Sequence, residues 1–308
     1  MVKSSGDVGT GTNEAGANAR GIVLLILTVA GFSCMDASAK WLNLREHSLQ
    51  TVAIRYAGSF LITACFLNPW TRPGILRSSQ PILQIVRGLC VFGSSVGGYT
   101  ALKTLPLTVV TSITFAAPLL VALLAGPILG ETLGPRRAVA IVVGFVGVLV
   151  ITRPGTAGFQ PAMWLALGAA GCNAGYFLIT RLLSRHDAPE TTHFYTGMVG
   201  TLVSVPLALP VWQTPTSAHM WFVMGFISLV GAGAHWLLIL AHKHAPASVL
   251  SPFFYAQLLF AALIGAIVFG NVPDRWTIVG GSIVIGSGLY LLYRERIRHH
   301  SPSVDVAV

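Results

Sequence analysis

The chain has 308 residues, of which 54% are hydrophobic and only 9% are charged, and its formal net charge is +9. Soluble domains carry about 25% charged residues, so a soluble fold of this length would expose more apolar surface than it could tolerate. The basic residues lie in short connections and at the C-terminus without a nucleic-acid-binding motif, which excludes a nucleic-acid-binding domain. The composition therefore predicts an integral membrane protein.

Long apolar segments follow one another along almost the whole chain. Residues 1–19 are mostly small and polar, which predicts a disordered tail. The first apolar segment covers about residues 21–42 and is long enough to span, so its Ala37-Ser38-Ala39 motif does not indicate a cleaved signal peptide. Most segments approach the ~20 residues that a ~30 Å hydrocarbon core requires, which predicts ten transmembrane helices. The other nine segments lie at about residues 51–69, 82–102, 107–130, 137–152, 161–183, 193–211, 219–241, 246–270 and 276–293.

The two halves of the sequence are copies that align without a gap. Residues 101–131 match residues 241–271 at nine of 31 positions, including Lys103 with Lys243 and Pro106 with Pro246. We call the constant shift that carries Lys103 onto Lys243 the repeat offset. Each copy contains five helices, and because five is odd, the second copy enters the membrane upside down. Inverted repeats of this kind are typical of secondary transporters, which bind substrate between the repeats near the midplane.

The repeat sets the expected fold and domain organisation. We expect an all-α integral membrane protein with ten transmembrane helices in two inverted five-helix repeats, at residues 20–152 and 161–294. With both termini in the cytoplasm, the cytoplasmic side holds twelve Lys and Arg residues and the opposite side holds four. This asymmetry predicts a multi-pass protein of the bacterial inner membrane with cytoplasmic termini and a cytoplasmic tail at residues 295–308. Arg87, near the start of the third helix, is expected to anchor this topology.

The segments that match between the two copies also resemble a known family. They read ALKTLPLTVVTSITFAAPLLVALLAGPILGE at residues 101–131 and AHKHAPASVLSPFFYAQLLFAALIGAIVFGN at residues 241–271. These segments resemble the EamA family of the drug/metabolite transporter superfamily, over about residues 20–295. Gly130-Glu131 fits the end of the family's fourth helix, whereas Asn271 replaces the acid in the second copy.

The resemblance carries expectations about function. It implies a transporter without an ATPase part, which agrees with a sequence that has no Walker-type phosphate loop. It also implies a central cavity lined by both repeats, with the fifth and tenth helices as scaffold. The segment GFSCMDASAKWL at residues 31–42 is similar to a bacterial subgroup that includes riboflavin and S-adenosylmethionine importers.

Ionisable side chains within the expected helices are the first candidates for a site, because each costs at least ~2.5–3.5 kcal/mol at mid-depth. Asp36 and Lys40 lie four residues apart in the first helix and therefore share a face. Arg55 lies early in the second helix, so all three occupy the outer half of the membrane and can form one polar cluster. The alternative is a pair between Asp36 and Lys40 that only locks the helix, with Lys40 extending outward beside Trp41.

Polar positions also recur at the repeat offset, which maps Asp36 onto Tyr176 and Ser95 onto His235. Repeat-related positions flank a pseudo-two-fold axis, so we expect them to face a shared cavity, although a lone helical histidine is more often a packing residue. Aromatic and hydrogen-bonding side chains suit a planar or amphipathic metabolite. The candidate substrate-binding or gating residues are Asp36, Arg55, Ser95, Tyr99, Asn173, Tyr176, His235, Trp236, Tyr255 and Gln257.

Together these features predict alternating-access transport of a small organic metabolite, a vitamin or nucleoside-like compound such as riboflavin or S-adenosylmethionine. Export of amino acids or drugs by the same family is the alternative. A membrane-embedded enzyme would need a paired acid, a metal cluster or an activated nucleophile, and a channel would need a continuous polar stripe. We expect no enzyme activity, no cofactor, no metal site and no nucleic acid. The expected partners are a small-molecule substrate and the lipid bilayer. The sequence leaves open whether the protein forms a homodimer.

Overall fold

The computed structural model describes residues 8–67, 73–129, 134–184 and 186–300, and within these ranges it contains helices and short connections but no strand. Ten of the described segments are long and apolar enough to cross a membrane, which confirms the predicted fold class. The elements are α1 (Val8–Asn43), α2 (Ser48–Phe66), η1 (Pro73–Leu76), α3 (Pro81–Ala101), α4 (Leu107–Thr114), α5 (Ala117–Leu129), α6 (Pro135–Thr152), α7 (Ala162–Leu183), α8 (Pro189–Ala208), η2 (Leu209–Val211), α9 (Ala218–His244), α10 (Ala247–Leu250), η3 (Ser251–Tyr255), α11 (Ala256–Phe269) and α12 (Arg275–His300).

The N-terminal segment differs from the expectation. Helix α1 begins at Val8, so in the structure residues 8–19 continue the first helix, whereas the sequence predicted a disordered tail there. Extending a helix that already exists adds one hydrogen bond per residue without a new nucleation step, which explains why these polar residues continue it. Helix α12 likewise continues through residues 295–300. Residues 1–7, Gly130 and Glu131 lie outside the described residues.

Two spans that the sequence predicted to be continuous are interrupted. The fourth span is divided into α4 and α5 around Phe115, three residues before Pro118, which cannot donate to the Thr114 carbonyl oxygen and clashes with it. The ninth span is divided into α10, the 3₁₀ segment η3 and α11. Phe115 and Tyr255, which correspond at the repeat offset, contact each other with ring centres 5.1 Å apart. Secondary transporters use interrupted helices of this kind to line their substrate sites.

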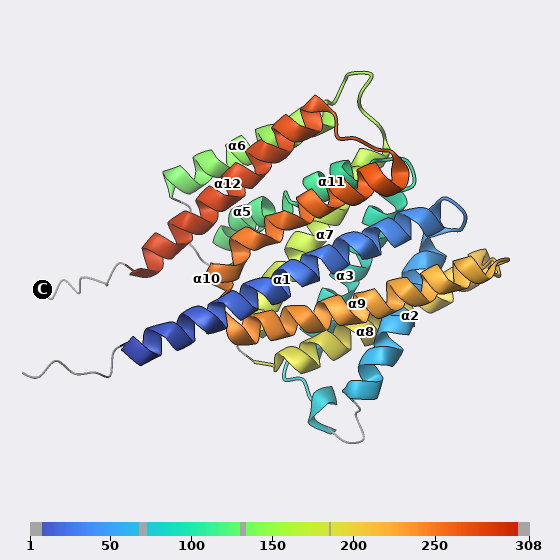
Figure 1. Cartoon of the computed structure of the whole chain (residues 1–308), viewed down its shortest axis with the longest axis horizontal. Coiled ribbons are helices and arrows are strands. Elements are labelled where there is room, and N and C mark those ends of the chain that lie inside the picture. Colours follow the sequence, from blue (N-terminus) through green and yellow to red (C-terminus); the bar gives the residue numbers. More distant parts are fainter. Residues whose placement is uncertain (1–7, 68–72, 130–133, 185, 301–308) are drawn as a thin grey trace, which may run out of the picture.

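The main helix pairs each join one repeat to the other. Helix α1 packs against α9, α3 against α7, α2 against α8, and α6 against α12 (Figure 1). The repeat offset turns the α1–α9 pair into the α7–α3 pair, so these two pairs are equivalent. The two repeats are therefore interleaved rather than placed side by side as separate bundles.

Contacts between α6 and α12 show the symmetry at the level of residues. A Cβ atom added at Gly147 would lie 2.8 Å from the carbonyl oxygen of Gly280, so the backbones approach closely there. On the same interface the Ser287 hydroxyl donates to the carbonyl oxygen of Ala140. The repeat offset maps Gly147 onto Ser287 and Ala140 onto Gly280, so the two contacts are copies of each other. Such reciprocity is the signature of a two-fold axis and supports the inverted repeat.

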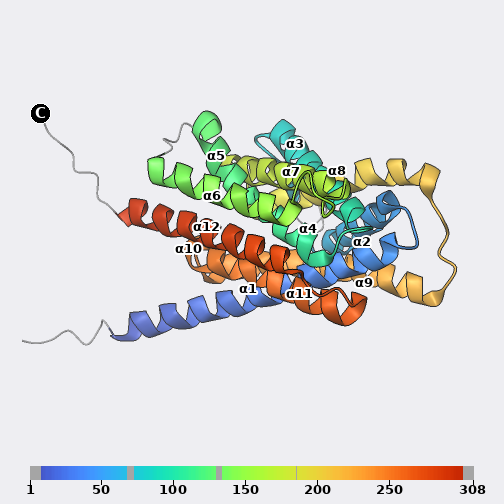
Figure 2. The same cartoon turned by 90° about the horizontal axis from the view of Figure 1, so that it is seen from above.

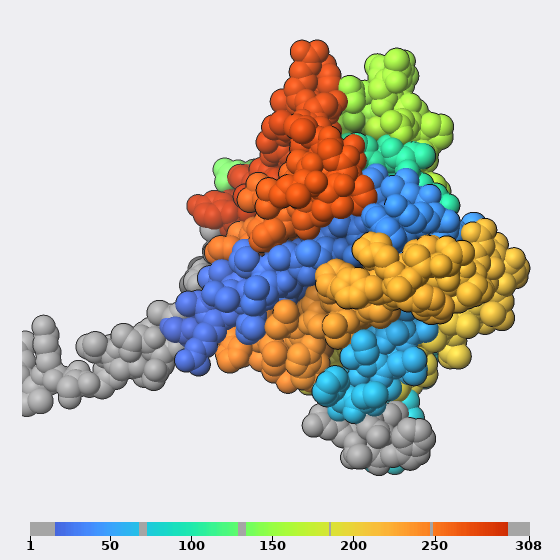
Figure 3. Space-filling model, turned by 45° about the vertical axis from the view of Figure 1, so that its right-hand side comes forward, coloured from blue at the N-terminus to red at the C-terminus, as the bar shows by residue number. Residues whose placement is uncertain are grey.

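The exterior of the bundle suits lipid. Large apolar side chains point outward, with Leu259 73% and Ile267 74% exposed, whereas polar side chains such as Gln50 and Gln84 are fully buried. Figure 3 shows α1 crossing the molecular surface between α9 and α11. Helix α1 starts, and α12 ends, at the same end of the bundle (Figure 2). We call this end the termini side and the opposite end, where α1 meets α2, the far side.

Candidate functional site

Five of the predicted residues gather between helices of both repeats. Asp36 of α1, Arg55 of α2, Ser95 and Tyr99 of α3, and Gln257 of α11 form what we call the far-side cluster. The Gln257 side-chain amide donates to the Asp36 carboxylate over 3.4 Å, and Arg55 Nη2 donates to Ser95 Oγ over 2.8 Å. Each residue of the first repeat lies within about two turns of the far-side end of its helix. The structure thus places Asp36 and Arg55 of the predicted polar cluster in one group without Lys40, and adds a contact from the second repeat.

Arg55 is the buried cation of this cluster. Its side chain is 5% exposed, and its guanidinium lies 3.9 Å from the ring centre of Tyr56 and 5.6 Å from that of Tyr99. A guanidinium has five N–H donors. Arg55 Nε is buried without an acceptor, and the buried Tyr99 hydroxyl has no hydrogen-bond partner. Buried polar groups are normally satisfied, so these two groups require an explanation.

Asp36 lies near Arg55 but does not pair with it. Within the described residues, no ion pair joins Asp36 to Arg55 or to Lys40. Lys40 instead donates from Nζ to the carbonyl oxygens of Leu102, at 2.9 Å, and Leu105, at 2.6 Å. These carbonyl groups follow the end of α3, where backbone acceptors lack helical donors. The expectation that Lys40 pairs with Asp36 or extends outward is therefore wrong: Lys40 is buried and holds the connection between α3 and α4.

A second buried arginine lies toward the termini side. Arg87 of α3 donates from Nε to Thr180 Oγ1 over 2.6 Å and from Nη1 to the carbonyl oxygen of Thr192 over 3.0 Å. Nη1 also donates to the Thr196 hydroxyl, and the guanidinium lies 4.4 Å from the ring centre of Tyr176. We call these five residues the termini-side cluster.

This arrangement corrects the role expected for Arg87. Its side chain is only 5% exposed, so it does not anchor the topology at a membrane edge. It joins α3 of the first repeat to α7 and α8 of the second. Sequence position alone suggested an anchor because Arg87 lies only six residues after the start of α3, and its partners all come from the other repeat.

His235 lies between two aromatic neighbours. Its Nδ1 is 2.8 Å from the carbonyl oxygen of Gly231, its ring stacks on His193 at 5.6 Å, and the edge of Phe32 meets it at 5.0 Å. Phe32 is one turn before Asp36 on α1, so His235 is linked to the far-side cluster through that helix. The sequence analysis missed His193, because the repeat offset maps it onto the apolar Ala53.

Three other predicted residues are not joined to either cluster. Tyr255 is buried against Phe115, and its hydroxyl occupies the space beside Gly288 of α12. Trp236 is 39% exposed at the surface of the bundle, and Asn173 is half-buried in α7. Their selection relied on helix membership, and helix rotation decided where each side chain points.

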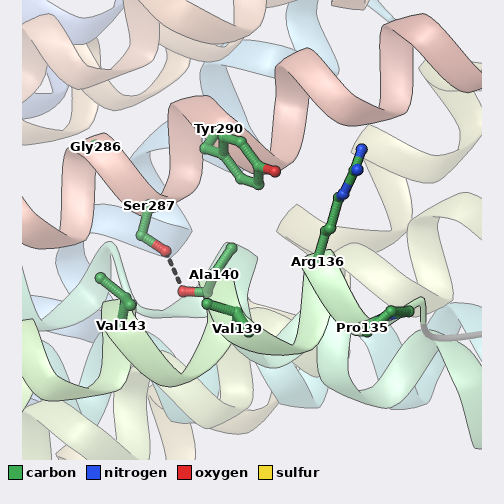
Figure 4. Close-up of a pocket in the computed structure, with 8 residues that line it drawn as sticks. All are labelled: Pro135, Arg136, Val139, Ala140, Val143, Gly286, Ser287 and Tyr290. Atoms are coloured by element: carbon green, nitrogen blue, oxygen red, sulfur yellow. Dashed lines mark hydrogen bonds between the residues drawn. The ribbon is translucent and has the colours of Figure 1, made fainter.

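A surface pocket of about 440 Å³ lies apart from both clusters, between α6 and α12 (Figure 4). Its walls are mainly apolar side chains of α6, such as Val139 and Val143, with Arg136 and Tyr290 beside them. It contains none of the candidate residues, and it borders the helix pair that the resemblance assigns to the scaffold. We therefore place the candidate site at the far-side cluster.

Comparison with known proteins agrees with this architecture. The model of the EamA-like transporter family matches the chain twice, at residues 19–153 and 160–294. The chain belongs to the EamA-like transporter family. The two matches correspond closely to the two five-helix repeats. A solved crystal structure that is 15% identical in sequence matches this chain with a TM-score of 0.58. The match covers 88% of this chain and 98% of the other chain, and it shows a shared fold alone.

Several characterised relatives of this EamA-like protein are transporters. The S-adenosylmethionine uptake transporter of Rickettsia prowazekii is 28% identical over 279 residues, covering 90% of this chain and 93% of the relative. The riboflavin transporter of Vibrio cholerae is 27% identical, covering 90% and 94%. The pseudopaline exporter CntI of Pseudomonas aeruginosa is 26% identical, covering 86% and 93%. The chain is thus a multi-pass bacterial membrane transporter of a small metabolite and not an enzyme.

Proposed function

We propose that this EamA-like transporter takes up a small organic metabolite across the bacterial inner membrane by alternating access, and that its substrate binds at the far-side cluster. The observation that carries this proposal is the buried Arg55, whose Nε lacks an acceptor in a cluster built from both repeats. The relatives named as uptake transporters for S-adenosylmethionine and as riboflavin transporters favour uptake of such a metabolite over export.

Contacts at the ends of the spans support a mechanism in which the two sides open in turn. On the far side, the Gln50 amide donates to the carbonyl oxygen of Gln213 over 2.7 Å and accepts from its backbone N–H over 2.8 Å. On the termini side, Asp187 accepts hydrogen bonds from Ser78, Ser79 and Gln84. Both sets join the first repeat to the second. Because the sets are separate, one side can lose its contacts while the other keeps them.

Uptake by the purified, full-length protein in proteoliposomes tests the function. We expect time-dependent accumulation of radiolabelled S-adenosylmethionine or riboflavin that saturates with concentration, while liposomes without the protein accumulate neither compound. Accumulation of neither compound would contradict the proposed substrate range. Loss of preloaded substrate without uptake would indicate export, the alternative that the exporter relative represents.

The orientation is a separate part of the proposal. The predicted topology puts twelve Lys and Arg residues on the side of the termini and four on the opposite side, which supports cytoplasmic termini. We predict that a reporter that fluoresces only in the cytoplasm is fluorescent when fused to either terminus. A phosphatase that is active only in the periplasm should be inactive when fused to either terminus. Phosphatase activity at a terminal fusion would reverse the orientation and would exchange the two sides in the transport cycle.

A further inference from the structure

The far-side cluster holds two opposite charges that do not pair with each other. Asp36 accepts a hydrogen bond from Gln257, Arg55 donates one to Ser95, and within the described part of the chain no ion pair joins the two residues. A charge inside a membrane protein normally finds a counter-charge or a water-filled cavity. Each of these two charges therefore lacks a direct ion-pair partner among the described residues.

The unpaired donors of Arg55 and Tyr99 point to the chemistry of the missing group. Arg55 Nε and the Tyr99 hydroxyl are both buried and both lack a partner. A planar guanidinium next to a hydroxyl donor suits a carboxylate, which accepts several hydrogen bonds at once and is often bound bidentately by arginine. Asp36 and the Gln257 side-chain oxygen are acceptors and suit a group that donates, such as an ammonium.

We propose that the far-side cluster binds the α-amino-acid group of the substrate, with the carboxylate on Arg55 and Tyr99 and the ammonium on Asp36. The inference rests on the proposed function and specifies its substrate class. An α-amino acid has an ammonium group and a carboxylate bonded to the same carbon atom. It can therefore bind two neighbouring side chains of opposite charge that do not pair with each other. The bound pair adds no net charge to the interior of the membrane.

The two candidate metabolites differ in whether they contain an α-amino-acid group. S-adenosylmethionine carries an α-ammonium and an α-carboxylate, whereas riboflavin carries neither. The far-side cluster therefore favours S-adenosylmethionine or another amino acid derivative. Phe32 lies one turn before Asp36 on α1, and its ring meets that of His235 of α9 at 5.0 Å, so the two rings provide an aromatic surface for the remainder of such a substrate.

The decisive pair in the test is S-adenosylmethionine and its decarboxylated form, which differ only in the α-carboxylate. Binding to purified full-length protein is measured by isothermal titration calorimetry with S-adenosylmethionine, its decarboxylated form, 5′-methylthioadenosine and riboflavin. Losing a charge-assisted contact in a buried site weakens binding by about 10- to 100-fold. We expect decarboxylated S-adenosylmethionine to bind weaker by that factor and 5′-methylthioadenosine, which lacks the whole amino-acid group, to bind weakest. Equal affinity for the first two compounds, or no binding of S-adenosylmethionine, would overturn the proposal.

Two variants test which residue binds the carboxylate of the substrate and which binds its ammonium group. Arg55→Gln should bind S-adenosylmethionine and its decarboxylated form with similar affinity, because the carboxylate has lost its partner. Asp36→Asn should still distinguish these two compounds while binding both more weakly. Arg45→Gln is the matched control, because Arg45 is an exposed arginine that stacks on Trp41 at 3.7 Å near the same end of the bundle. An Arg55→Gln variant that keeps the full discrimination would overturn the assignment.

The outcomes also separate this inference from the proposed function. If riboflavin is taken up and S-adenosylmethionine does not bind, the protein is still a metabolite importer, but the amino-acid site is wrong. If S-adenosylmethionine binds with the expected dependence on Arg55 but moves only outward, the site is right and uptake is wrong.

Discussion

The two buried arginines of this EamA-like transporter stand in contrasting surroundings. Arg87 donates to Thr180, Thr192 and Thr196 and so joins α3 to two helices of the other repeat. Arg55 donates to Ser95, leaves its Nε without an acceptor and has an unpaired carboxylate nearby. Both side chains are equally buried, at 5% exposure. Burial therefore does not separate the two arginines, whereas the number of hydrogen bonds that each donates does, and our proposal of a structural and a binding role rests on that difference.

Under our proposal, the termini-side cluster contributes stability and the far-side cluster recognises the ligand. A fully satisfied buried network makes one arrangement of helices favourable and rigid. A partly satisfied network keeps hydrogen-bonding capacity for a ligand. Four predictions can break or sharpen this contrast, in order of decreasing expected effect.

Replacing Arg87 should have the largest effect. We expect Arg87→Met to destabilise the protein by about 2–4 kcal/mol, because three oxygen acceptors lose a charged donor within the membrane. Arg87→Lys should restore little of this loss, because one ammonium cannot reproduce the planar fork that reaches two helices. Membrane abundance and thermal unfolding of the detergent-solubilised protein measure the change. Normal stability of Arg87→Met would remove the distinction between the clusters.

The Asp36 and Arg55 double-mutant cycle should give different results for stability and for transport. Without substrate the two residues form no direct ion pair, so the coupling between Asp36→Asn and Arg55→Gln should be weaker in thermal unfolding than in uptake. Each single variant should reduce the uptake rate by about 10-fold or more. The double variant should reduce it by less than the product of the two single reductions. Strong coupling in unfolding would instead show a direct pair, and additive losses in uptake would mean that the two residues do not act on one ligand.

His235 should influence transport more than folding. Its ring contacts His193 and Phe32 without an ion pair, so His235→Ala removes an aromatic surface. We expect uptake to fall by about 3- to 10-fold, the value of one lost aromatic contact, while membrane abundance stays near that of the wild type. His242→Ala, in the last turn of α9, is the matched control. Unchanged uptake by His235→Ala would identify a packing residue.

The smallest effect should come from the termini-side contact at Asp187, outside the spans. Burial raises the pKa of this carboxyl group, but hydrogen bonds from Ser78, Ser79 and Gln84 outweigh it and lower the pKa from 3.8 to about 2. The stabilisation is therefore complete above about pH 4 and disappears as the pH falls through about 2. We expect Asp187→Asn to lower the melting temperature by about 2 °C at pH 7, with the difference shrinking in acid. A difference that grows in acid would contradict this account.

The sequence predicted the fold far better than the site. Apolar segments and the repeat offset were sufficient for ten spans and two inverted repeats, because lipid imposes length and hydropathy on every helix. The same information placed Asp36, Arg55 and Ser95 in helices but could not give helix rotation. Trp236 therefore turned out to be exposed at the surface of the bundle, although it directly follows His235.

Other differences arose because partners come from distant parts of the chain. Lys40 finds acceptors at Leu102 and Leu105, which no local pattern connects to α1. Pro252, which lies in η3, marks the interruption of the ninth span. A hydropathy average over many residues hides the effect of this single proline, so the span was predicted to be continuous. The corresponding interruption beside Pro118 shows that different prolines produce breaks at equivalent places.

The contact between Phe115 and Tyr255 has a consequence for the ancestry of the chain. Only a residue on the pseudo-two-fold axis can touch its own counterpart, and these two rings meet at 5.1 Å. In a five-helix ancestor that assembled as an antiparallel pair, one residue would have met its own copy here, so any mutation would have changed both sides of the contact. In a single chain that contains both copies this constraint is absent, because the two positions can change independently. One copy now carries a phenyl ring and the other a phenol, whose hydroxyl lies beside Gly288 on one side of the axis only.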